Sequence, residues 1–259
     1  MSFTNVLSGL CLPDDDDDDT KLIDTIYPNL DHLHDCSEDE KTAYFSERVI
    51  LAAKNTDVDS LNNAALERLP GDEKTYHSAD QAFDDGGNPV NSFTQEYLNS
   101  ISISGMPLHL TTLKVGSTVI LLRNMDYPGG LCNGTRLIIV SLGRYTIQGK
   151  ILTGKHRGET AFIPRISLDT APSAGLPFTL RRRQFPVRLA FAMTINKAQG
   201  QSLKVVGIHL RTPVFAHGQL YVAISRATDS RQIYISVPRT DGILVTDNIV
   251  YSEVFPTGI

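Results

Sequence analysis

The sequence lacks any run of about 18 apolar residues, so a hydrophobic membrane-spanning helix is not expected. The first residues, Met1 to Leu12, have neither a basic start nor a long apolar region, which argues against a secretory signal. Cysteine is scarce: Cys11, Cys36 and Cys132 are odd in number and far apart. They fit reduced thiols inside a cell better than a disulfide framework.

Acidic residues are scarce in one long stretch of the chain. Between Arg136 and Arg211 there are 13 basic residues and only two acidic ones, Glu159 and Asp169. The overall net charge is nevertheless −5, because residues 1–75 carry 18 acidic against 6 basic side chains. A basic stretch of this kind can neutralise phosphates and indicates a nucleic-acid partner. The alternative is a solvated surface whose acidic partners lie elsewhere.

Paired metal ligands are lacking as well. His32, His34 and Cys36 alternate, but no second ligand pair follows at the spacing of a metal site. We therefore expect no metal site in this chain. The unbroken acidic run Asp14–Asp19 repels itself and predicts a loop, and residues 1–40 as a whole are expected to be an acidic, partly disordered segment.

Hydrophobic patterning predicts an α/β domain after this segment. Arg48–Ala53 is a short apolar run typical of a buried strand, and Asn55 follows as a candidate helix N-cap. Apolar residues then recur at helical spacing from Val58 to Leu69, until Pro70-Gly71 ends the helix. A buried strand that leads directly into a helix is a common opening unit of an α/β domain.

Residues 76–180 interrupt this pattern. Residues 76–112 are polar and poorly periodic, which is typical of an insertion. Short strands are then expected at 118–122, 137–142, 145–152 and 160–168. Strands at this spacing predict a small β-barrel. The α/β pattern returns in residues 181–259, with a strand or strand-to-helix junction at 189–198, strands at 205–210 and 232–237, and a helix at 218–227.

Three segments carry the candidate chemistry. Residues 194–203, T-I-N-K-A-Q-G-Q-S-L, gather hydrogen-bonding side chains around one glycine, which suits contact with a phosphate backbone. Residues 218–226, G-Q-L-Y-V-A-I-S-R, place Arg226 at the end of an apolar helix, where a guanidinium can reach a phosphate. The third segment is G-L-C-N-G-T-R, residues 130–136. Taken singly, such a segment is better explained as a polar loop, or as an arginine that satisfies its own helix carbonyls.

In this order, residues 194–203 and 218–226 resemble the last two helicase motifs of PIF-one-like superfamily-one DNA helicases. Residues 130–136 and 184–192 are similar to the versions found in helicases of Helitron transposons, and residues 22–30 are similar to a segment just before their second RecA-like domain. The resemblance implies an α/β fold. The second RecA-like domain, with a mainly parallel sheet, would comprise residues 41–75 and 181–259, and the inserted barrel, called 2B, would lie in residues 76–180.

The resemblance also implies roles for single residues. Arg226 would be an arginine finger, which contacts the γ-phosphate of ATP on the other RecA-like domain and stabilises the transition state. The ATP-binding residues would be Gln199, Gly200, Gln201 and Gln219. The DNA-binding residues would be Asn55, Thr194, Asn196, Lys197, Arg123, Asn133 and Arg136. Many family members have His where this chain has Asn196, and Asn keeps a donor without titrating.

The phosphate-binding half of the family is missing from this sequence. The one match to P-loop spacing, Gly149–His156, has His where a Ser or Thr should meet magnesium, and Gly158 follows where a helix should run. Asp39-Glu40 and Asp72-Glu73 do not follow an apolar strand and do not resemble a Walker B end. ATP and Mg²⁺ are therefore expected in the intact family enzyme, with neither bound by this chain alone. Whether the chain is itself an enzyme stays open.

The resemblance implies the C-terminal half of an ATP-dependent DNA helicase; in the family, the intact enzyme moves 5′-to-3′ and serves recombination, repair and telomere maintenance. Its expected partners are single-stranded DNA and a chain that supplies the first RecA-like domain, with no membrane. A nuclear location follows from the family, with the mitochondrion as the alternative. Two other interpretations stay open: a stand-alone single-stranded nucleic-acid-binding module, and an inactive transposon-derived remnant.

Overall fold

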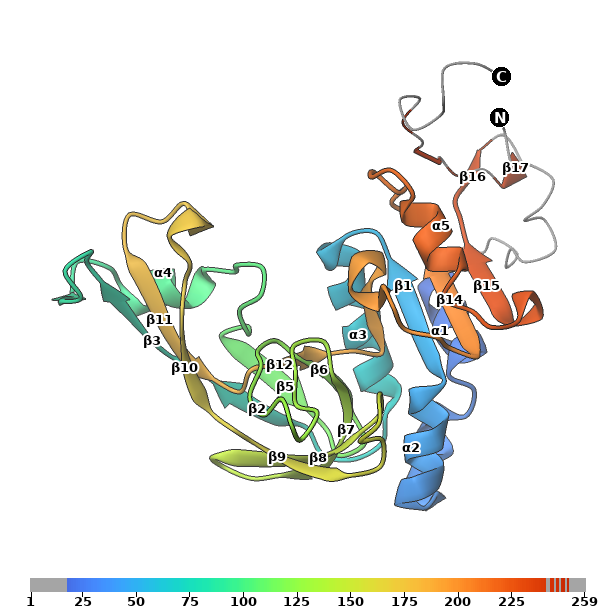
Figure 1. Cartoon of the computed structure of the whole chain (residues 1–259), viewed down its shortest axis with the longest axis horizontal. Coiled ribbons are helices and arrows are strands. Elements are labelled where there is room, and N and C mark those ends of the chain that lie inside the picture. The colour runs from blue at the N-terminus through green and yellow to red at the C-terminus, as the bar shows by residue number, and fades with distance from the viewer. Residues whose placement is uncertain (1–17, 241–242, 245, 247, 250, 252–259) are drawn as a thin grey trace. The chain divides into compact units, whose positions relative to one another are not determined.

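The computed structural model describes residues 18–240, 243–244, 246, 248–249 and 251 (Figure 1). The chain divides into two compact units, which are described separately below. Unit 1 takes in the chain up to Cys36 together with residues 43–70 and 190–259, and unit 2 takes in residues 37–42 and 71–189. None of the described helices combines the length and the apolar composition needed to cross a membrane.

Unit 1 is built on a four-stranded parallel sheet in the order β13-β1-β14-β15. The strands are β1 (Arg48–Ala52), β13 (Ala192–Thr194), β14 (Val205–His209) and β15 (Ile233–Ser236). All three neighbouring pairs run parallel, which confirms the expected α/β fold with a mainly parallel sheet. The strands are almost fully buried, as expected where helices cover both faces of a sheet. The short pair β16 (Arg239–Thr240) and β17 (Ile243–Leu244) lies outside this sheet.

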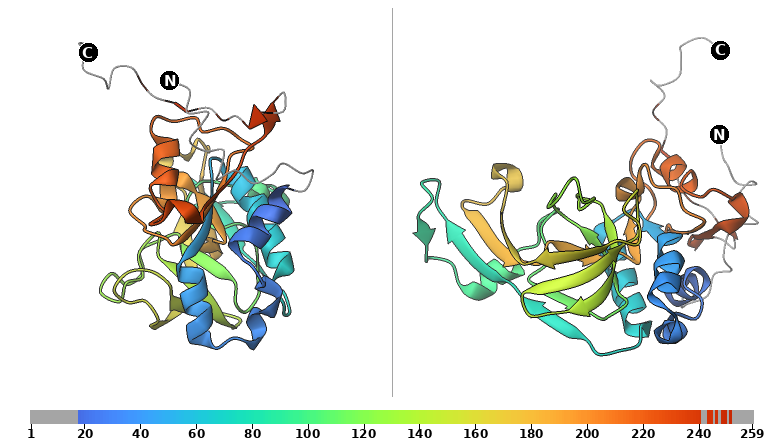
Figure 2. Two further views of the ribbon diagram at one scale, coloured as in Figure 1. Left: turned by 90° about the vertical axis from the view of Figure 1, so that its right-hand side faces the viewer. Right: turned by 60° about the horizontal axis from the view of Figure 1, so that its bottom comes forward.

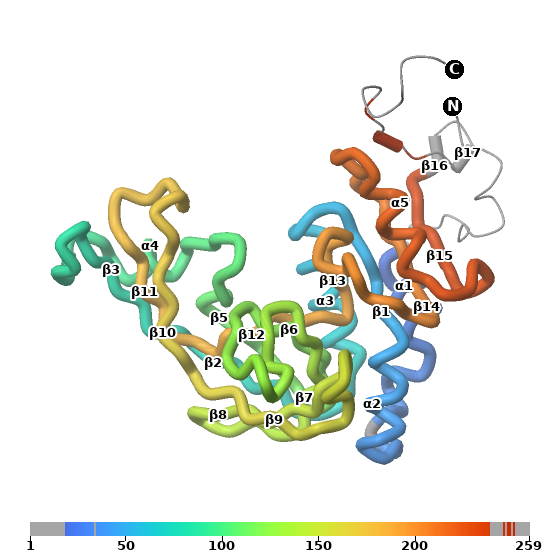
Figure 3. Tube along the Cα trace, viewed as in Figure 1, coloured from blue at the N-terminus to red at the C-terminus, as the bar shows by residue number. Residues whose placement is uncertain are grey.

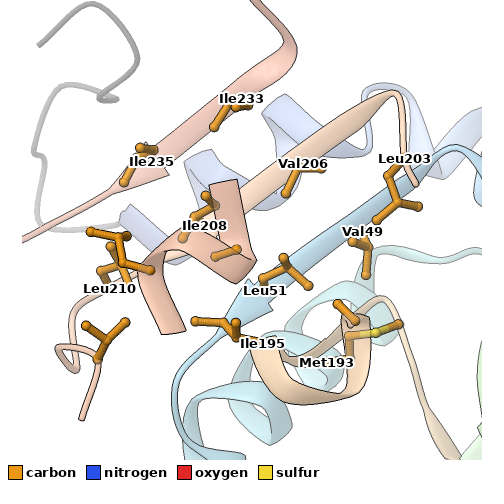
Figure 4. Packing of buried hydrophobic residues seen from close by; sticks show 14 of the residues in the cluster. Val49, Leu51, Met193, Ile195, Leu203, Val206, Ile208, Leu210, Ile233 and Ile235 are labelled. Atoms are coloured by element: carbon orange, nitrogen blue, oxygen red, sulfur yellow. The ribbon is translucent and has the colours of Figure 1, made fainter. Parts of the chain in front are cut away.

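One face of this sheet carries a continuous apolar core. Leu51 and Ile208 from the two central strands share a cluster with α5 (Gln219–Ile224), as the close view in Figure 4 shows. The short 3₁₀ helix η3 (Ile195–Ala198) joins the same cluster through its first and last residues. A further turn, η4 (Ser230–Gln232), leads into β15. Burial on this face fixes where η3 and α5 present their polar residues.

Helices α1 (Asp18–Ile26) and α3 (Asn55–Arg68) pack against the sheet and against each other. Gly207 of β14 permits the close approach of α1, because a Cβ added there would lie 2.7 Å from Cγ1 of Ile26. Successive strand residues point to opposite faces of the sheet, so Gly207 faces α1 and its neighbour Ile208 faces the core shared with α5. Helix α3 begins at Asn55, so this residue is the first of the helix and not the expected N-cap, which is Lys54.

The loop expected over Asp14–Asp19 is wrong for Asp18 and Asp19, the part of that run that the structure describes. Asp18 and Asp19 begin α1 instead of continuing a loop, and η1 (Leu30–Asp35) and α2 (Glu38–Ser46) follow. The apolar side of α1 is fully buried, and acidic residues in a first helical turn suit the helix dipole, which offsets their mutual repulsion. Asp14–Asp17, Cys11 and Met1–Leu12 lie outside the described residues.

Unit 2 contains a five-stranded antiparallel sheet in the order β12-β6-β7-β8-β9. Its strands are β6 (Thr118–Leu121), β7 (Arg136–Leu142), β8 (Thr146–Ile151), β9 (Thr160–Pro164) and β12 (Val187–Leu189). A two-stranded ribbon of β2 (Lys74–His77) and β5 (Leu110–Leu113) shares its apolar core through Tyr76 and Leu113. The pairings leave β12 and β9 as edge strands, so closure into a barrel stays a prediction.

A second antiparallel sheet of unit 2 has the order β10-β11-β3-β4 (Figure 2). Its strands are β3 (Ala79–Phe83), β4 (Pro89–Val90), β10 (Ile166–Asp169) and β11 (Thr179–Gln184), with the helices α4 (Gln95–Ser100) and η2 (Pro172–Ala174) beside them in sequence. The polar, poorly periodic pattern of residues 76–112 did not predict β3, β4 or α4, because these elements are short and largely exposed. The Cα trace in Figure 3 follows β3 and β11 as they run side by side.

Candidate nucleotide and nucleic-acid site

Parallel pairing brings the predicted site loops of unit 1 to one edge of the sheet. Ala52 at the end of β1 pairs with Thr194 on one side and with His209 on the other. The turn before Asn55 and the loop after Thr194 therefore leave the sheet at the same carboxyl edge. Ligand sites of open α/β sheets lie at this edge.

The segment after Thr194 is divided between buried and exposed positions. Ile195 and Ala198 are fully buried in the core, whereas Asn196, Lys197 and Gln199 are exposed. Apolar anchoring therefore fixes η3 and presents its polar side chains outward. Gly200 follows with φ +81°, a backbone conformation that other residues rarely adopt, and turns the chain toward Leu203. The arrangement offers several donors on a fixed turn, as contact with a phosphate backbone requires.

Arg226 connects this loop to the end of α5. Its guanidinium donates to the carbonyl oxygen of Gln201 at 3.1 Å and to that of Val222 at 3.0 Å. Its own carbonyl oxygen accepts from the backbone N–H of Leu203 at 2.9 Å. The two motif segments recognised in the sequence thus meet at Arg226. The side chain is partly exposed, so a phosphate group could replace these carbonyl partners.

Gln219 has a different environment from the one expected of an ATP ligand. It is 3% exposed, and its Oε1 accepts from the backbone N–H groups of Phe215 and Ala216 at 3.0 and 3.3 Å. Its buried Nε2 has no hydrogen-bond partner among the described residues. In this arrangement Gln219 fixes the loop before α5, and its exposed neighbour Tyr221 is the more accessible side chain.

The remaining predicted DNA contacts belong to both units. Asn55 is exposed in unit 1, and Asn133 is exposed in unit 2. Arg123 of unit 2 is partly exposed and donates to the carbonyl oxygen of Gly105 at 2.9 Å. Arg136 is 0% exposed, so its side chain has no surface in this structure with which to reach a phosphate. Burial removes Arg136 from the DNA contacts that we propose below.

Asp19 and His209 are joined by a hydrogen bond at the end of β14. Asp19 Oδ1 lies 2.9 Å from His209 Nε2 and 3.9 Å from Arg211 Nε. The hydrogen bond from His209 lowers the pKa of the Asp19 carboxyl, against the opposing effect of its partial burial. The pair links α1 to the carboxyl edge of the sheet.

Sequence reasoning missed three exposed aromatic residues of unit 2. Tyr127, Tyr145 and Phe162 are 80%, 63% and 63% exposed. Exposed rings among basic residues can stack on nucleic-acid bases. Phe162 could have been found from strand alternation, because its neighbours Ala161 and Ile163 point into the core.

The segment with P-loop spacing lies in a hairpin. Gly149 is in β8, and β9 follows at Thr160 with no helix between them. Position eight, His156, packs against Gly130 and pairs with Glu159 at 3.0 Å. Rejection of this segment as a P-loop is confirmed, since a P-loop needs the N-terminus of a following helix. The described residues contain no group of three or more potential metal ligands among His, Cys, Asp and Glu.

Two family matches coincide with this arrangement. Residues 96–142 match the family described as the DNA helicase Pif1 2B domain, and residues 182–241 match a helicase family of herpesviruses. Human ATP-dependent DNA helicase PIF1 is 34% identical over 180 residues, which cover 68% of this chain and 25% of that protein. The chain is Pif1-like. This confirms the resemblance seen in the three sequence motifs.

Solved Pif1 structures agree in fold. Pif1 helicase from Candida albicans superposes with a TM-score of 0.57 at 23% identity, over 90% of this chain and 56% of that chain. Bacteroides Pif1 bound to ssDNA gives a TM-score of 0.54 at 22% identity, over 88% and 51%. At this identity the likeness concerns the fold alone. This Pif1-like chain thus spans about half of the solved chains and a quarter of the human relative.

Proposed function

We propose that this chain forms the C-terminal half of an ATP-dependent 5′-to-3′ DNA helicase. The observation that carries the proposal is the meeting of two helicase-like segments at Arg226, whose guanidinium lies 3.1 Å from the Gln201 carbonyl oxygen. An arginine in this position can act as a finger on ATP bound by the missing first RecA-like domain. Gln199, Gly200 and Gln201 would border that nucleotide, and Gln219 would hold the loop before α5.

Single-stranded DNA would lie on the surface formed by Asn55, Thr194, Asn196 and Lys197. Exposed donors and a cation on one sheet edge support this part of the proposal. Arg123 and Asn133 would contribute contacts from unit 2. ATP and Mg²⁺ would be held by the first RecA-like domain, either in the same protein or in a partner chain. Recombination, repair or telomere maintenance in the nucleus would be the biological setting, with the mitochondrion as the alternative.

The test is ATP hydrolysis with and without single-stranded DNA. We expect no turnover from the chain alone. Fusion of the P-loop domain of human PIF1 before this chain is expected to give DNA-stimulated turnover. Arg226→Ala in the fusion should lower that turnover by about 10³-fold. The matched control Arg231→Ala removes an exposed arginine five positions on, whose ion-pair partner among the described residues is Asp229, and should leave turnover unchanged.

Equal turnover of the Arg226→Ala fusion and its parent would overturn the assignment of the finger. Turnover by the chain alone would show that it contains a phosphate site of its own, and Gly149–His156 would have to be reconsidered.

A stand-alone nucleic-acid-binding module is the second candidate. The exposed rings Tyr127, Tyr145 and Phe162 favour it, because stacking on bases needs no ATP. Binding of an oligonucleotide at increasing salt separates this function from an inactive remnant. Real phosphate contacts give a steep fall in affinity with salt, whereas a remnant without a binding surface gives no saturable binding at low salt.

A further inference from the structure

Strand β13 lies at one edge of the parallel sheet of unit 1. The N–H of Ile50 in β1 donates to the carbonyl oxygen of Phe191 at 3.1 Å, so the carbonyl of Phe191 points toward β1. The main-chain groups of successive strand residues point to opposite edges, and those of Ala192 therefore point away from β1. Ala192 is 0% exposed, and buried main-chain groups need a hydrogen-bond partner.

Asn62 provides that partner from helix α3, which lies next to β13 (Figure 3). Its Oδ1 accepts from the N–H of Ala192 at 2.8 Å, and its Nδ2 donates to the carbonyl oxygen of Ala192 at 3.1 Å. The amide offers one acceptor and one donor side by side, as the main chain of a neighbouring strand would. At this position the side chain of Asn62 takes the place of a further strand.

Asn62 is a polar residue on the apolar side of its helix. The other buried residues of α3 are all apolar: Val58, Leu61, Ala65 and Leu66. Asn62 is 2% exposed among them, although asparagine favours a helix less than leucine does. A leucine would fill the same space, but the N–H and carbonyl of Ala192 would then lose these partners. The two hydrogen bonds to β13 are therefore what asparagine adds at this position.

These hydrogen bonds join two segments that reach the carboxyl edge of the sheet. Helix α3 begins at Asn55, about 10 Å before Asn62 along the helix axis. Strand β13 ends at Thr194, two residues after Ala192. Asn55 and Thr194 both belong to the surface proposed above for single-stranded DNA. The bonds between Asn62 and Ala192 therefore connect two parts of one proposed binding surface.

The other connection between these segments is the pairing of β1 with β13, in which Ala52 pairs with Thr194. Strand β13 has three residues, and η3 follows it directly. The bonds from Asn62 hold the side of β13 that faces away from β1, so the strand is fixed from both sides just before η3. The exposed residues of η3, including Lys197, thereby keep their position relative to Asn55. A surface that is fixed before binding loses less free energy when a ligand arrives.

We propose that Asn62 is a positioning residue for the binding of single-stranded DNA. It holds β13, and with it Thr194 and η3, in register with the start of α3, so that both segments meet the same stretch of phosphate backbone. Asn62 itself is buried and does not touch the DNA. The inference rests on the proposed function, because it assigns a role within the DNA surface proposed there.

Binding of a fluorescent oligothymidine to the whole chain, followed by anisotropy at several salt concentrations, tests the proposal. Lys197→Ala should reduce the steepness of log K against log salt by about 0.7, the value for one phosphate contact on a single strand. Asn62→Leu should weaken binding about tenfold and reduce the steepness similarly, although it removes no charge. The effects of the two changes should not add in the double variant, because a displaced η3 no longer brings Lys197 to the strand.

The matched control is Leu66→Ala, which removes a buried side chain one turn further along α3. It should lower the melting temperature, because a cavity is left in the core, and should leave the affinity and its salt dependence unchanged. A role of Asn62 in stability alone would lower the folded fraction in the same way, without changing the salt dependence of the folded protein.

Thermal melting shows which variants are folded at the assay temperature. If Asn62→Leu does not fold, Asn62→Asp keeps the bond from the Ala192 N–H, loses the bond to its carbonyl, and should weaken binding in the same direction. A folded Asn62 variant with the affinity of the parent would overturn the inference, as would equal weakening by Leu66→Ala. In either case a lower affinity of Lys197→Ala would leave the proposed DNA surface in place. Absence of binding by the parent, or an unchanged affinity of Lys197→Ala, would overturn the proposed DNA surface, and the role of Asn62 with it.

Discussion

The guanidinium of Arg226 donates to the main-chain carbonyl oxygen of Gln201, 25 residues earlier in the chain and 3.1 Å away. The contact depends on the path of the backbone and not on the Gln201 side chain. Gly200 sets that path through its positive φ of +81°. The position of the proposed finger is therefore coupled to one glycine in the preceding loop.

Gly200→Ala should lower ATP turnover of the fusion protein although Arg226 is intact. A Cβ at this φ strains the backbone by about 1 kcal/mol and shifts the Gln201 carbonyl, although no neighbouring atom lies within 4 Å to obstruct it. Gly175→Ala is the matched control, because φ is +72° there and its surroundings are equally open. Both variants should lose similar thermal stability, and only Gly200→Ala should lose turnover. Equal turnover in the two would show that the loop does not position Arg226.

Arg182→Met should destabilise the protein by about 3–5 kcal/mol. It leaves Asp80 as a buried charge without its partner and frees the carbonyls at the end of α4. Arg183→Met, at the next position but on the exposed side of β11, should change stability by less than about 0.5 kcal/mol. Urea unfolding followed by circular dichroism measures both. A small effect of Arg182→Met would mean that the buried pair contributes little to folding.

Gly207→Ala should destabilise unit 1 by about 1–3 kcal/mol, because the added Cβ would lie 2.7 Å from Cγ1 of Ile26. Ile26→Ala alone should cost about 2–5 kcal/mol through loss of a buried side chain. The double variant should cost less than the sum of the two, because Ile26→Ala removes the atom that clashes. Thermal or urea unfolding of the four proteins gives this coupling directly. Simple additivity would contradict close packing between α1 and β14.

Acidification should remove the stability that Asp19 contributes. Its pKa is lowered in the folded state by the hydrogen bond from His209, so the contribution is present above the ordinary value of 3.8. It is lost as the pH falls from about 4 through the folded-state pKa. Asp19→Asn should therefore show a smaller loss of unfolding free energy between pH 5 and pH 2 than the parent protein. If the unfolding free energies of the two proteins fell by the same amount between pH 5 and pH 2, the prediction would be refuted.

The sequence by itself determined the elements that depend on neighbouring residues. The apolar run Arg48–Ala53 predicted β1, and helical spacing up to Leu69 predicted α3, because these patterns repeat over one strand or a few turns. The same applies to the motif around Gly200 and to Arg226 at the end of α5, which carried the Pif1-like resemblance. The acidic run, in contrast, predicted a loop where α1 begins. That prediction considered the repulsion between the carboxylates and not the apolar residues that follow and bury the helix.

Only the tertiary structure decided which polar side chains are buried and which can reach a ligand. Arg136 and Arg183 are both arginines in strands of unit 2, yet one is fully buried and the other is exposed. Arg182 meets Asp80 from 102 positions away in the chain. Such contacts depend on the pairing of distant strands, and side-chain burial follows from that pairing. Local sequence specifies strands and helices, but it does not specify which distant strand covers a given side chain.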